Sequence, residues 1–170
     1  MSLFKNKDYS PIIIFILTFL FYLKTLAPTF LWSDSSKLCL FVKNKEIFSF
    51  SHGIHPAHTI LGILFSYLPF DLAYSQNLMS AFFSSFALAL FYLLCRELIG
   101  SPRVAFITSL TLSVSHTFWL YSVINETYSL LIFSLTLILL LGIKATSSNK
   151  MYIPIQSGHR FRFKPATDSD

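Results

Sequence analysis

Residues 72–95, LAYSQNLMSAFFSSFALALFYLLC, carry no charged side chain. A helix that crosses the hydrocarbon core of a bilayer, about 30 Å thick, needs roughly 20 mainly apolar residues, because each residue adds about 1.5 Å of length. This stretch exceeds that length and is flanked by Asp71 and Arg96. It therefore predicts a transmembrane helix, and the rest of the chain is interpreted around it.

The composition of the whole chain supports a membrane protein. The 170 residues are 54% hydrophobic and 17% aromatic, with a mean hydropathy of +0.60. Only 12% are charged, whereas a soluble domain usually carries about 25%. A water-soluble domain is thereby excluded. The net charge of +5 does not indicate nucleic-acid binding, because the basic residues lie between apolar blocks and form no basic stripe.

Three further apolar stretches are long enough to count as spans, which gives an all-α, polytopic helical membrane protein with about four transmembrane helices. The predicted spans cover residues 11–27, 72–95, 104–121 and 127–143. No span carries a charge in its middle and no internal repeat is evident, which disfavours a small transporter.

A fifth stretch within residues 47–70 also lacks charge, but only residues 59–70 are strongly apolar, too few to span. Cytoplasmic loops collect Lys and Arg, and most basic residues fall inside if this stretch does not cross. We therefore expect a cytoplasmic N-terminus, an outer loop over 28–71 with an interfacial or re-entrant helix at about 56–70, and an inner polar basic tail over 144–170. The composition of that tail predicts disorder or surface binding.

Acidic side chains near the outer boundary are candidates for chemistry. Asp34 follows the first span and Glu126 lies between the third and fourth, so this topology puts both carboxylates at one face. A carboxylate in a partly dry site can act as a general base. The alternative is structural, because Asp34 can cap a helix and Glu126 can lie in the first turn of the fourth helix.

The segment Ser51-His52-Gly53-Ile54-His55-Pro56-Ala57-His58 holds three histidines. Their spacing matches no standard zinc motif, so we expect no metal site here, and whether a divalent metal assists is left open. Pro56 predicts a helix start. A helix N-terminus with nearby His and Lys favours hydrogen bonding to a phosphate or sugar, with ordinary interfacial polar residues as the alternative.

The order of these features resembles the protein O-mannosyltransferase-like membrane proteins of the GT-C glycosyltransferase class. The resemblance rests on several short motifs between about Leu20 and Leu141. They are Thr25-Leu26-Ala27-Pro28-Thr29, Trp32-Ser33-Asp34-Ser35, Gly53-Ile54-His55-Pro56, Asn77-Leu78-Met79-Ser80-Ala81, Phe118-Trp119 and Glu126-Thr127-Tyr128.

The resemblance implies transfer of a sugar, mannose-type, from a polyprenyl-phosphate donor to a protein or glycan hydroxyl on the lumenal or periplasmic face. Asp34 would be the base, and Glu126 would orient the sugar or acceptor. The implied substrate and lipid-phosphate binding residues are His55, Lys37 and Trp32. The implied partners are the bilayer, the lipid-linked sugar and the acceptor, and the implied location is the endoplasmic reticulum or bacterial inner membrane.

The competing hypothesis is a non-catalytic, truncated membrane subunit or lipid-binding partner. Members of the family carry more spans, so we expect this chain to correspond to their N-terminal part. The family motif usually reads Asp-Ser-x-Glu, and here Lys37 occupies the last position. A lysine three residues from Asp34 can pair with it and lower its basicity, which favours the non-catalytic hypothesis.

Overall fold

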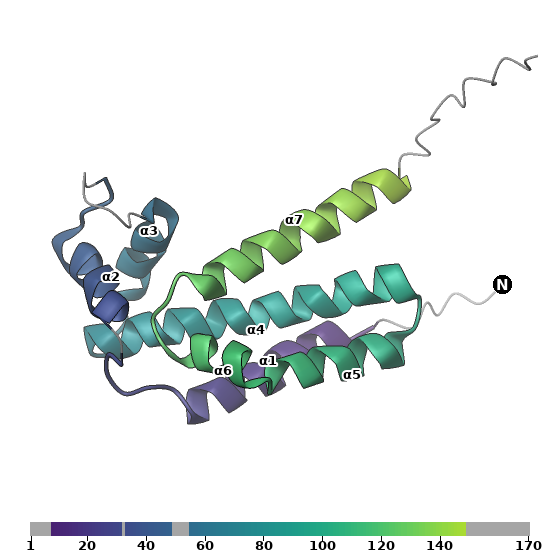
Figure 1. The fold of residues 1–170 in the computed structure, drawn as a ribbon, viewed down its shortest axis with the longest axis horizontal. Helices are drawn as coiled ribbons and strands as arrows, with labels where there is room; N and C mark the ends of the chain where they lie inside the picture. The colour runs from purple at the N-terminus through teal and green to yellow at the C-terminus, as the bar shows by residue number, and fades with distance from the viewer. Residues whose placement is uncertain (1–7, 32, 49–54, 149–170) are drawn as a thin grey trace, which may run out of the picture.

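The computed structural model describes residues 8–31, 33–48 and 55–148, and within them every regular element is a helix (Figure 1). The order is α1 (Ser10–Lys24), α2 (Ser33–Asn44), α3 (Pro56–Phe65), α4 (Leu72–Ile99), α5 (Pro102–Ser113), α6 (His116–Val123) and α7 (Tyr128–Ser148). The predicted all-α class is therefore confirmed for the described chain.

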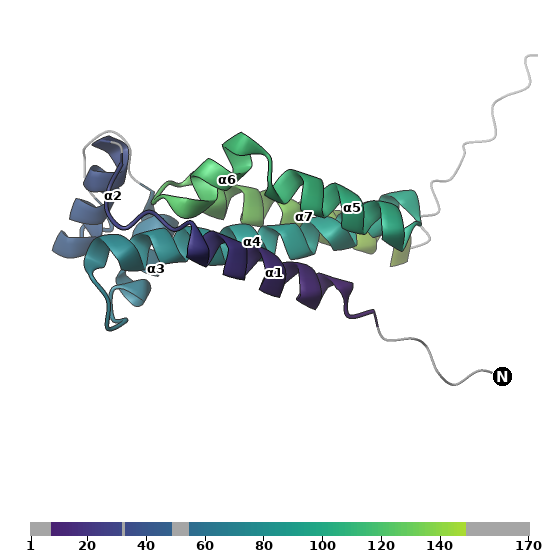
Figure 2. The same ribbon diagram turned by 90° about the horizontal axis from the view of Figure 1, so that it is seen from below.

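Helix α4 forms the centre of the bundle. It contacts α1, α5, α6 and α7 along its length, and α2 and α3 near its first residues (Figures 1 and 2). The Asp71 carboxylate caps its start by accepting from the Ala73 N–H at 3.1 Å. Gly100 ends it with a φ of 75°, a left-handed conformation that costs glycine little. Asp71 and Gly100 thus define the two ends of α4, which begins with the predicted span and continues four residues beyond its predicted end at Cys95.

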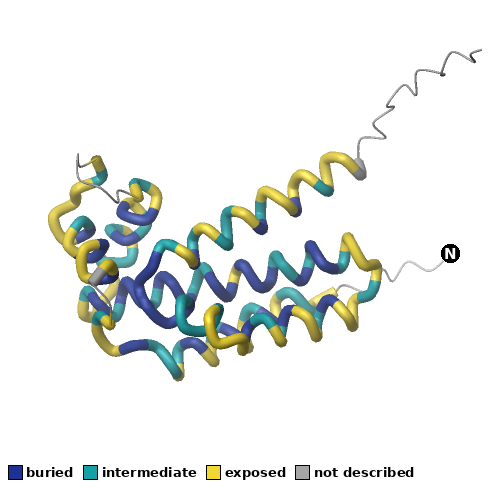
Figure 3. Tube along the Cα trace, viewed as in Figure 1, coloured by how far each residue is buried: buried dark blue, intermediate teal, exposed yellow. Residues whose placement is uncertain are grey.

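Aromatic side chains join the neighbouring helices to α4. Phe15 of α1 meets Phe82 edge to face with ring centroids 5.7 Å apart, and Phe86 stacks on Phe133 of α7 at 5.4 Å. Such pairs add stabilisation beyond the apolar area that they bury. The outward faces stay apolar and exposed, as lipid-facing helices require, and α7 shows many exposed positions (Figure 3).

Two described helices, α4 and α7, are long and apolar enough to cross a membrane, and a bent pair raises this to three if it counts as one span. That pair is α5 and α6, whose axes differ by 65°, so the predicted span over 104–121 is not one continuous helix. The Tyr22 hydroxyl donates to the Ser113 carbonyl at 2.9 Å, which satisfies a backbone group freed at the bend. Helix α1 has 15 residues, so the count of four spans stays a prediction.

The loop over 28–71 differs from its prediction in two ways. Residues 33–44, expected only as part of the outer loop, form the helix α2, as the capping alternative for Asp34 would require. The interfacial helix ends at Phe65, with turns and bends in place of its last residues up to 70. At the C-terminal side, α7 continues to Ser148, beyond the predicted boundary at 143. The remainder of the predicted tail lies outside the described residues.

The bundle has two distinct ends. Helices α2 and α3 and the loop between α6 and α7 lie at one end, and the start of α1 and the turn between α4 and α5 lie at the other (Figures 1 and 2). The two loops that carry the predicted site residues therefore meet at the same end of the bundle.

Candidate functional site

Glu126 is the most buried carboxylate at the end of the bundle where α2, α3 and the connection between α6 and α7 lie. It lies in the short connection between α6 and α7, with 9% of its surface exposed. The Ser35 hydroxyl of α2 donates to Glu126 Oε1 at 3.5 Å, and the Asn125 side-chain amide donates to the Ser35 carbonyl at 3.2 Å. These contacts join the first turn of α2 to the start of α7.

Burial raises the pKa of Glu126 above its ordinary value, because an apolar environment disfavours the charged form. The negative charge of Asp34 raises it further, and the hydrogen bond from Ser35 opposes the shift. The structure therefore brings Asp34 and Glu126 close enough for their charges to interact. Glu126 precedes the first residue of α7 by two positions, just outside the first turn in which the structural alternative places it.

Asp34 has a different environment. It lies in the first turn of α2, where the helix dipole favours an acidic side chain, and it is exposed. Lys37, one turn later, places its ammonium 3.3 Å from Asp34 Oδ1, with both side chains about 70% exposed. An exposed pair of this kind contributes little to stability and can open readily. Asp34 is thus accessible to a ligand, and Lys37 is its immediate neighbour.

Backbone contacts hold the chain between α1 and α2 against the rest of the site. The Ala27 N–H donates to the Val123 carbonyl at 3.1 Å. The Asn77 side chain of α4 donates to the carbonyls of Ala27 at 2.7 Å and Thr29 at 3.2 Å. The segment Thr25-Leu26-Ala27-Pro28-Thr29 therefore positions the residues that follow it, including Asp34.

The histidines of α3 occupy different environments. His55 immediately precedes the helix, is exposed and makes no side-chain capping bond. His58, which sequence reasoning did not select, is 1% exposed, and the Asn125 side chain lies near enough to interact with its ring. Burial lowers the pKa of His58 to about 4, the charge of His55 adds to this, and the Asn125 side chain opposes it. His58 is therefore neutral and lies beside Asn125.

A groove of about 340 Å³ opens between α3 and α7. Its lining residues are His55, Pro56, Ala57, His58, Thr127, Leu130, Leu131 and Ser134. It is polar where α3 begins and apolar along α7. Among the predicted substrate-binding residues, His55 lines this groove, Lys37 lies on α2 beside Asp34, and Trp32 lies outside the described residues.

No group of three or more His, Cys, Asp or Glu side chains among the described residues could hold a metal ion. Of the three histidines in the segment 51–58, His52 lies outside the described part of the chain. The sequence offered one indication that His58 belongs to the site, because it follows His55 by three residues and therefore lies one helical turn later. Its contact with Asn125 is tertiary, and spacing along the sequence does not reveal it.

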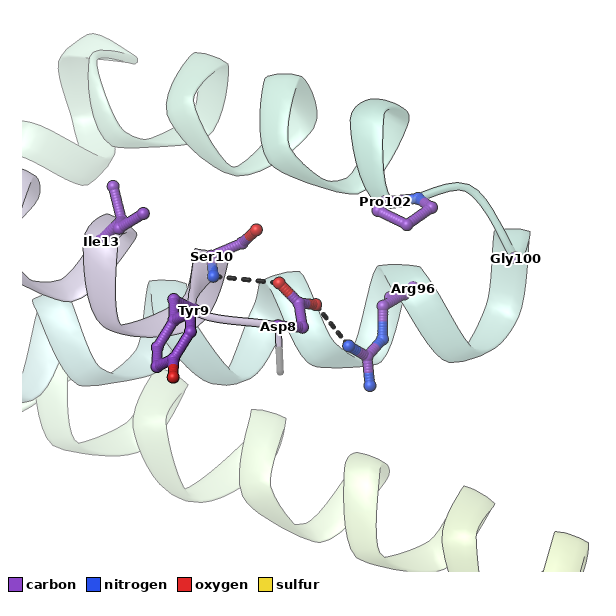
Figure 4. Close-up of a pocket in the computed structure, with 7 residues that line it drawn as sticks. All are labelled: Asp8, Tyr9, Ser10, Ile13, Arg96, Gly100 and Pro102. Atoms are coloured by element: carbon purple, nitrogen blue, oxygen red, sulfur yellow. Dashed lines mark hydrogen bonds and ion pairs between the residues drawn. The ribbon is translucent and has the colours of Figure 1, made fainter. Parts of the chain in front are cut away.

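A second cavity, of about 690 Å³, lies at the opposite end of the bundle (Figure 4). Asp8 there accepts from the Ser10 N–H at 3.0 Å and from the Tyr92 hydroxyl at 2.7 Å, and it pairs with Arg96. Although burial opposes it, these hydrogen bonds hold the pKa of Asp8 well below its usual range. The charged groups neutralise each other, and their contacts fasten the start of α1 to α4.

Comparison with known proteins gives a family match. The family model for the protein O-mannosyl-transferase TMEM260 N-terminal domain matches residues 51–160, which is more than half of the chain. The matched residues include α3, α4 and the Glu126 connection. No individual curated protein and no solved structure matched the chain.

Proposed function

Because the chain belongs to the family of the protein O-mannosyl-transferase TMEM260 N-terminal domain, we propose that it is a membrane glycosyltransferase-like protein. In this proposal a mannose-type sugar moves from a polyprenyl-phosphate donor to a protein or glycan hydroxyl. The reaction takes place on the lumenal or periplasmic face of the endoplasmic reticulum or bacterial inner membrane, and the N-terminus is cytoplasmic.

The observation that carries the proposal is the meeting of Asp34 and Glu126 at one end of an apolar helix bundle. Ser35, the neighbour of Asp34, donates to Glu126 across 91 positions of the sequence, and the charge of Asp34 acts on Glu126. Two carboxylates with different burial support different roles, because the environment of each sets its affinity for protons. The exposed carboxylate is open to an acceptor, and the buried one is held in a fixed position.

In the proposed reaction, Asp34 takes the proton of the acceptor hydroxyl while its oxygen attacks the anomeric carbon of the sugar. The bond between that carbon and the phosphate oxygen breaks with inversion, and the lipid phosphate leaves with the bonding electrons. Lys37 carries the positive charge nearest to Asp34 and would stabilise the leaving phosphate. Glu126 would accept a hydrogen bond from the sugar or acceptor and orient it.

Transfer of labelled mannose from polyprenyl-phosphate mannose to a serine- and threonine-containing peptide, in membranes that contain the chain, tests the proposal. Asp34→Asn should abolish transfer and leave membrane insertion unchanged. Glu46→Gln is the matched control, because Glu46 is an exposed carboxylate that bonds only to Asn44 in the described contacts. Undiminished transfer by the Asp34→Asn protein would remove Asp34 from the mechanism.

A second candidate, a non-catalytic membrane subunit or lipid-binding partner, is favoured by the ion pair between Asp34 and Lys37. A lysine 3.3 Å away engages the carboxylate and competes with an acceptor hydroxyl for it. The two candidates differ in the effect of replacing the carboxylates. If the chain is non-catalytic, Asp34→Asn and Glu126→Gln together leave its cellular role intact.

A further inference from the structure

The cavity of about 690 Å³ at the end of the bundle opposite to Asp34 and Glu126 adjoins another cavity of about 380 Å³ (Figure 4). Both are lined by Ser10 of α1 and Pro102 of α5, so we treat them together as the α1–α5 groove. The first cavity is also lined by Asp8, Ile13 and Arg96, and the second by Arg103, Phe106 and Ile107.

The charged residues of the α1–α5 groove lie at the ends of uncharged stretches. Asp8, Arg96 and Arg103 each bound one such stretch. The stretches are residues 9–23, 72–95 and 104–125. Charged side chains are costly inside the hydrocarbon core and collect at the ends of spans. The three residues therefore place this end of the groove at one boundary of the membrane, where phospholipid headgroups lie.

The charges of the groove do not cancel. Asp8 pairs with Arg96 and accepts from the Tyr92 hydroxyl at 2.7 Å, so its negative charge is compensated. Arg103 is exposed, and no carboxylate pairs with it in the described part of the chain. Glu97, next to Arg96 in sequence, is exposed and lines neither cavity. The described wall of the groove therefore has one uncompensated positive charge, on Arg103.

The wall beyond Arg103 is apolar. Phe106 and Ile107 follow Arg103 by three and four residues, which places them on the same face of α5. Ile107 is 64% exposed, and Ile13 of α1 adds an apolar side chain to the neighbouring cavity. An arginine at a membrane boundary can keep its guanidinium among the headgroups while its hydrocarbon stem covers apolar surface. The groove is thus cationic at the boundary and apolar toward the interior of the membrane.

A ligand that matches both parts carries a negative charge and a hydrocarbon chain on one molecule. A guanidinium binds phosphate oxygens through charge-assisted hydrogen bonds, and a phosphodiester with one negative charge matches one uncompensated arginine. A zwitterionic headgroup has no net charge to match it. A free phosphate ester without chains would leave the apolar wall along α5 uncovered.

We propose that the α1–α5 groove binds one acidic phospholipid, with its phosphate at Arg103 and an acyl chain against Phe106 and Ile107. The site lies at the opposite end of the bundle from Asp34 and Glu126, so it is separate from the proposed sugar transfer and does not depend on it. In the proposed topology this end faces the cytoplasm, and the cytoplasmic leaflet is the one that carries anionic lipids.

Native mass spectrometry of the full chain, released from dodecyl maltoside micelles, counts bound lipids and measures their dissociation constants. The probes are dioctanoyl phosphatidylglycerol and dioctanoyl phosphatidylcholine, which have the same chains and differ in net charge. Wild type should bind one phosphatidylglycerol about tenfold more tightly than phosphatidylcholine. Arg103→Gln should weaken phosphatidylglycerol binding by about tenfold and leave phosphatidylcholine binding unchanged. Arg103→Lys keeps the charge and should weaken binding by less than about threefold.

Two exposed residues of α7 provide matched controls. Lys144→Gln removes an exposed cation that lines neither cavity, and it should leave both affinities unchanged. Ile107→Ala shortens the apolar wall and should weaken phosphatidylglycerol binding by about threefold. Leu135→Ala is its control, because Leu135 is 54% exposed and lies outside the groove. If Arg103→Gln does not fold, Ile107→Ala replaces it.

Four results would overturn the lipid site. They are equal affinity of wild type for the two phospholipids, unchanged affinity for phosphatidylglycerol in Arg103→Gln or its replacement, and a loss in Lys144→Gln as large as that in Arg103→Gln. The fourth is displacement of the bound lipid by glycerophosphoglycerol, which has the same headgroup without chains and would show that the groove recognises a free phosphodiester. None of these measurements requires sugar transfer, so the lipid site and the proposed function stand or fall separately.

Discussion

The Ser35 hydroxyl donates to Glu126 Oε1 across 3.5 Å, although 91 positions separate the two residues in sequence. This contact joins α2 to the connection that precedes α7. It also explains why Asp34, one residue before Ser35, raises the pKa of Glu126. The relation between the two carboxylates therefore depends on the folding of residues 33–44 into a helix at this end of the bundle.

Replacing Glu126 with Gln should change the pH dependence of stability. The folded-state pKa of Glu126 is raised, mainly by burial, so its ionised form destabilises the fold as pH rises above the unfolded value of about 4.5. Glu126→Gln removes this cost and should have a thermal midpoint at pH 7.5 equal to or above that of wild type. The difference should shrink at pH 4.5. Circular dichroism in detergent measures the thermal midpoint at both pH values. If Glu126→Gln lowers the midpoint relative to wild type, and lowers it more at pH 7.5 than at pH 4.5, ionised Glu126 does not destabilise the fold.

His58 should make the fold sensitive to acid in the opposite direction. Burial lowers its folded-state pKa to about 4, against an unfolded value near 6.5, so its contribution is complete above pH 6.5 and is lost as pH falls toward 4. The shift corresponds to about 3 kcal/mol. His58→Leu should lose less stability than wild type between pH 7 and pH 4.5, and the exposed His116→Leu should behave as wild type. Parallel losses in wild type and His58→Leu would show that His58 does not titrate in this window.

Gly62 of α3 lies against side chains of both α2 and α4. A Cβ there would lie 2.5 Å from Val42 Cγ2 and 2.6 Å from Gln76 Oε1, and the Gln76 amide already donates to the Gly62 carbonyl at 2.9 Å. Gly62→Ala should therefore separate these helices and destabilise the fold by about 1–3 kcal/mol.

Gly142 provides the control for that substitution. It lies in α7, and a Cβ there would meet nothing within 4 Å. Gly142→Ala should leave the fold unchanged or stabilise it by up to about 1 kcal/mol, because alanine is the better helix former. Thermal unfolding of the two variants compares them directly. Equal effects would mean that the Gly62 contact is not tight.

Sequence reasoning predicted α4, the all-helical class and the placing of Asp34 and Glu126 at one end, because uncharged runs and the distribution of basic residues carry that information. It missed α2, although Leu38, Cys39 and Val42 fall on one face of a helix and are all buried. The helical spacing of these three apolar residues was present in the sequence, but the polar residues between and around them obscured it.

Other features required tertiary contacts that no local pattern reports. The bend between α5 and α6 falls at Val114 and Ser115, with neither proline nor glycine at the break. It is accompanied by the bond from the Tyr22 hydroxyl of α1 to the Ser113 carbonyl. His58 likewise interacts with Asn125, which lies 67 positions later. Both features follow from how distant segments pack.

Cysteine labelling in intact cells should determine which end of the bundle faces outward. Native Cys39 is a poor reporter, because it is 4% exposed and burial raises the pKa of its thiol to about 11, which leaves little thiolate to react. In a chain with Cys39→Ser and Cys95→Ser, Tyr67→Cys supplies a thiol at a position that is 74% exposed, on the turn after α3. Ser101→Cys supplies one at the opposite end. An impermeant maleimide should label the first and not the second, whereas labelling of Ser101→Cys alone would reverse the proposed orientation and place Asp34 and Glu126 on the cytoplasmic face.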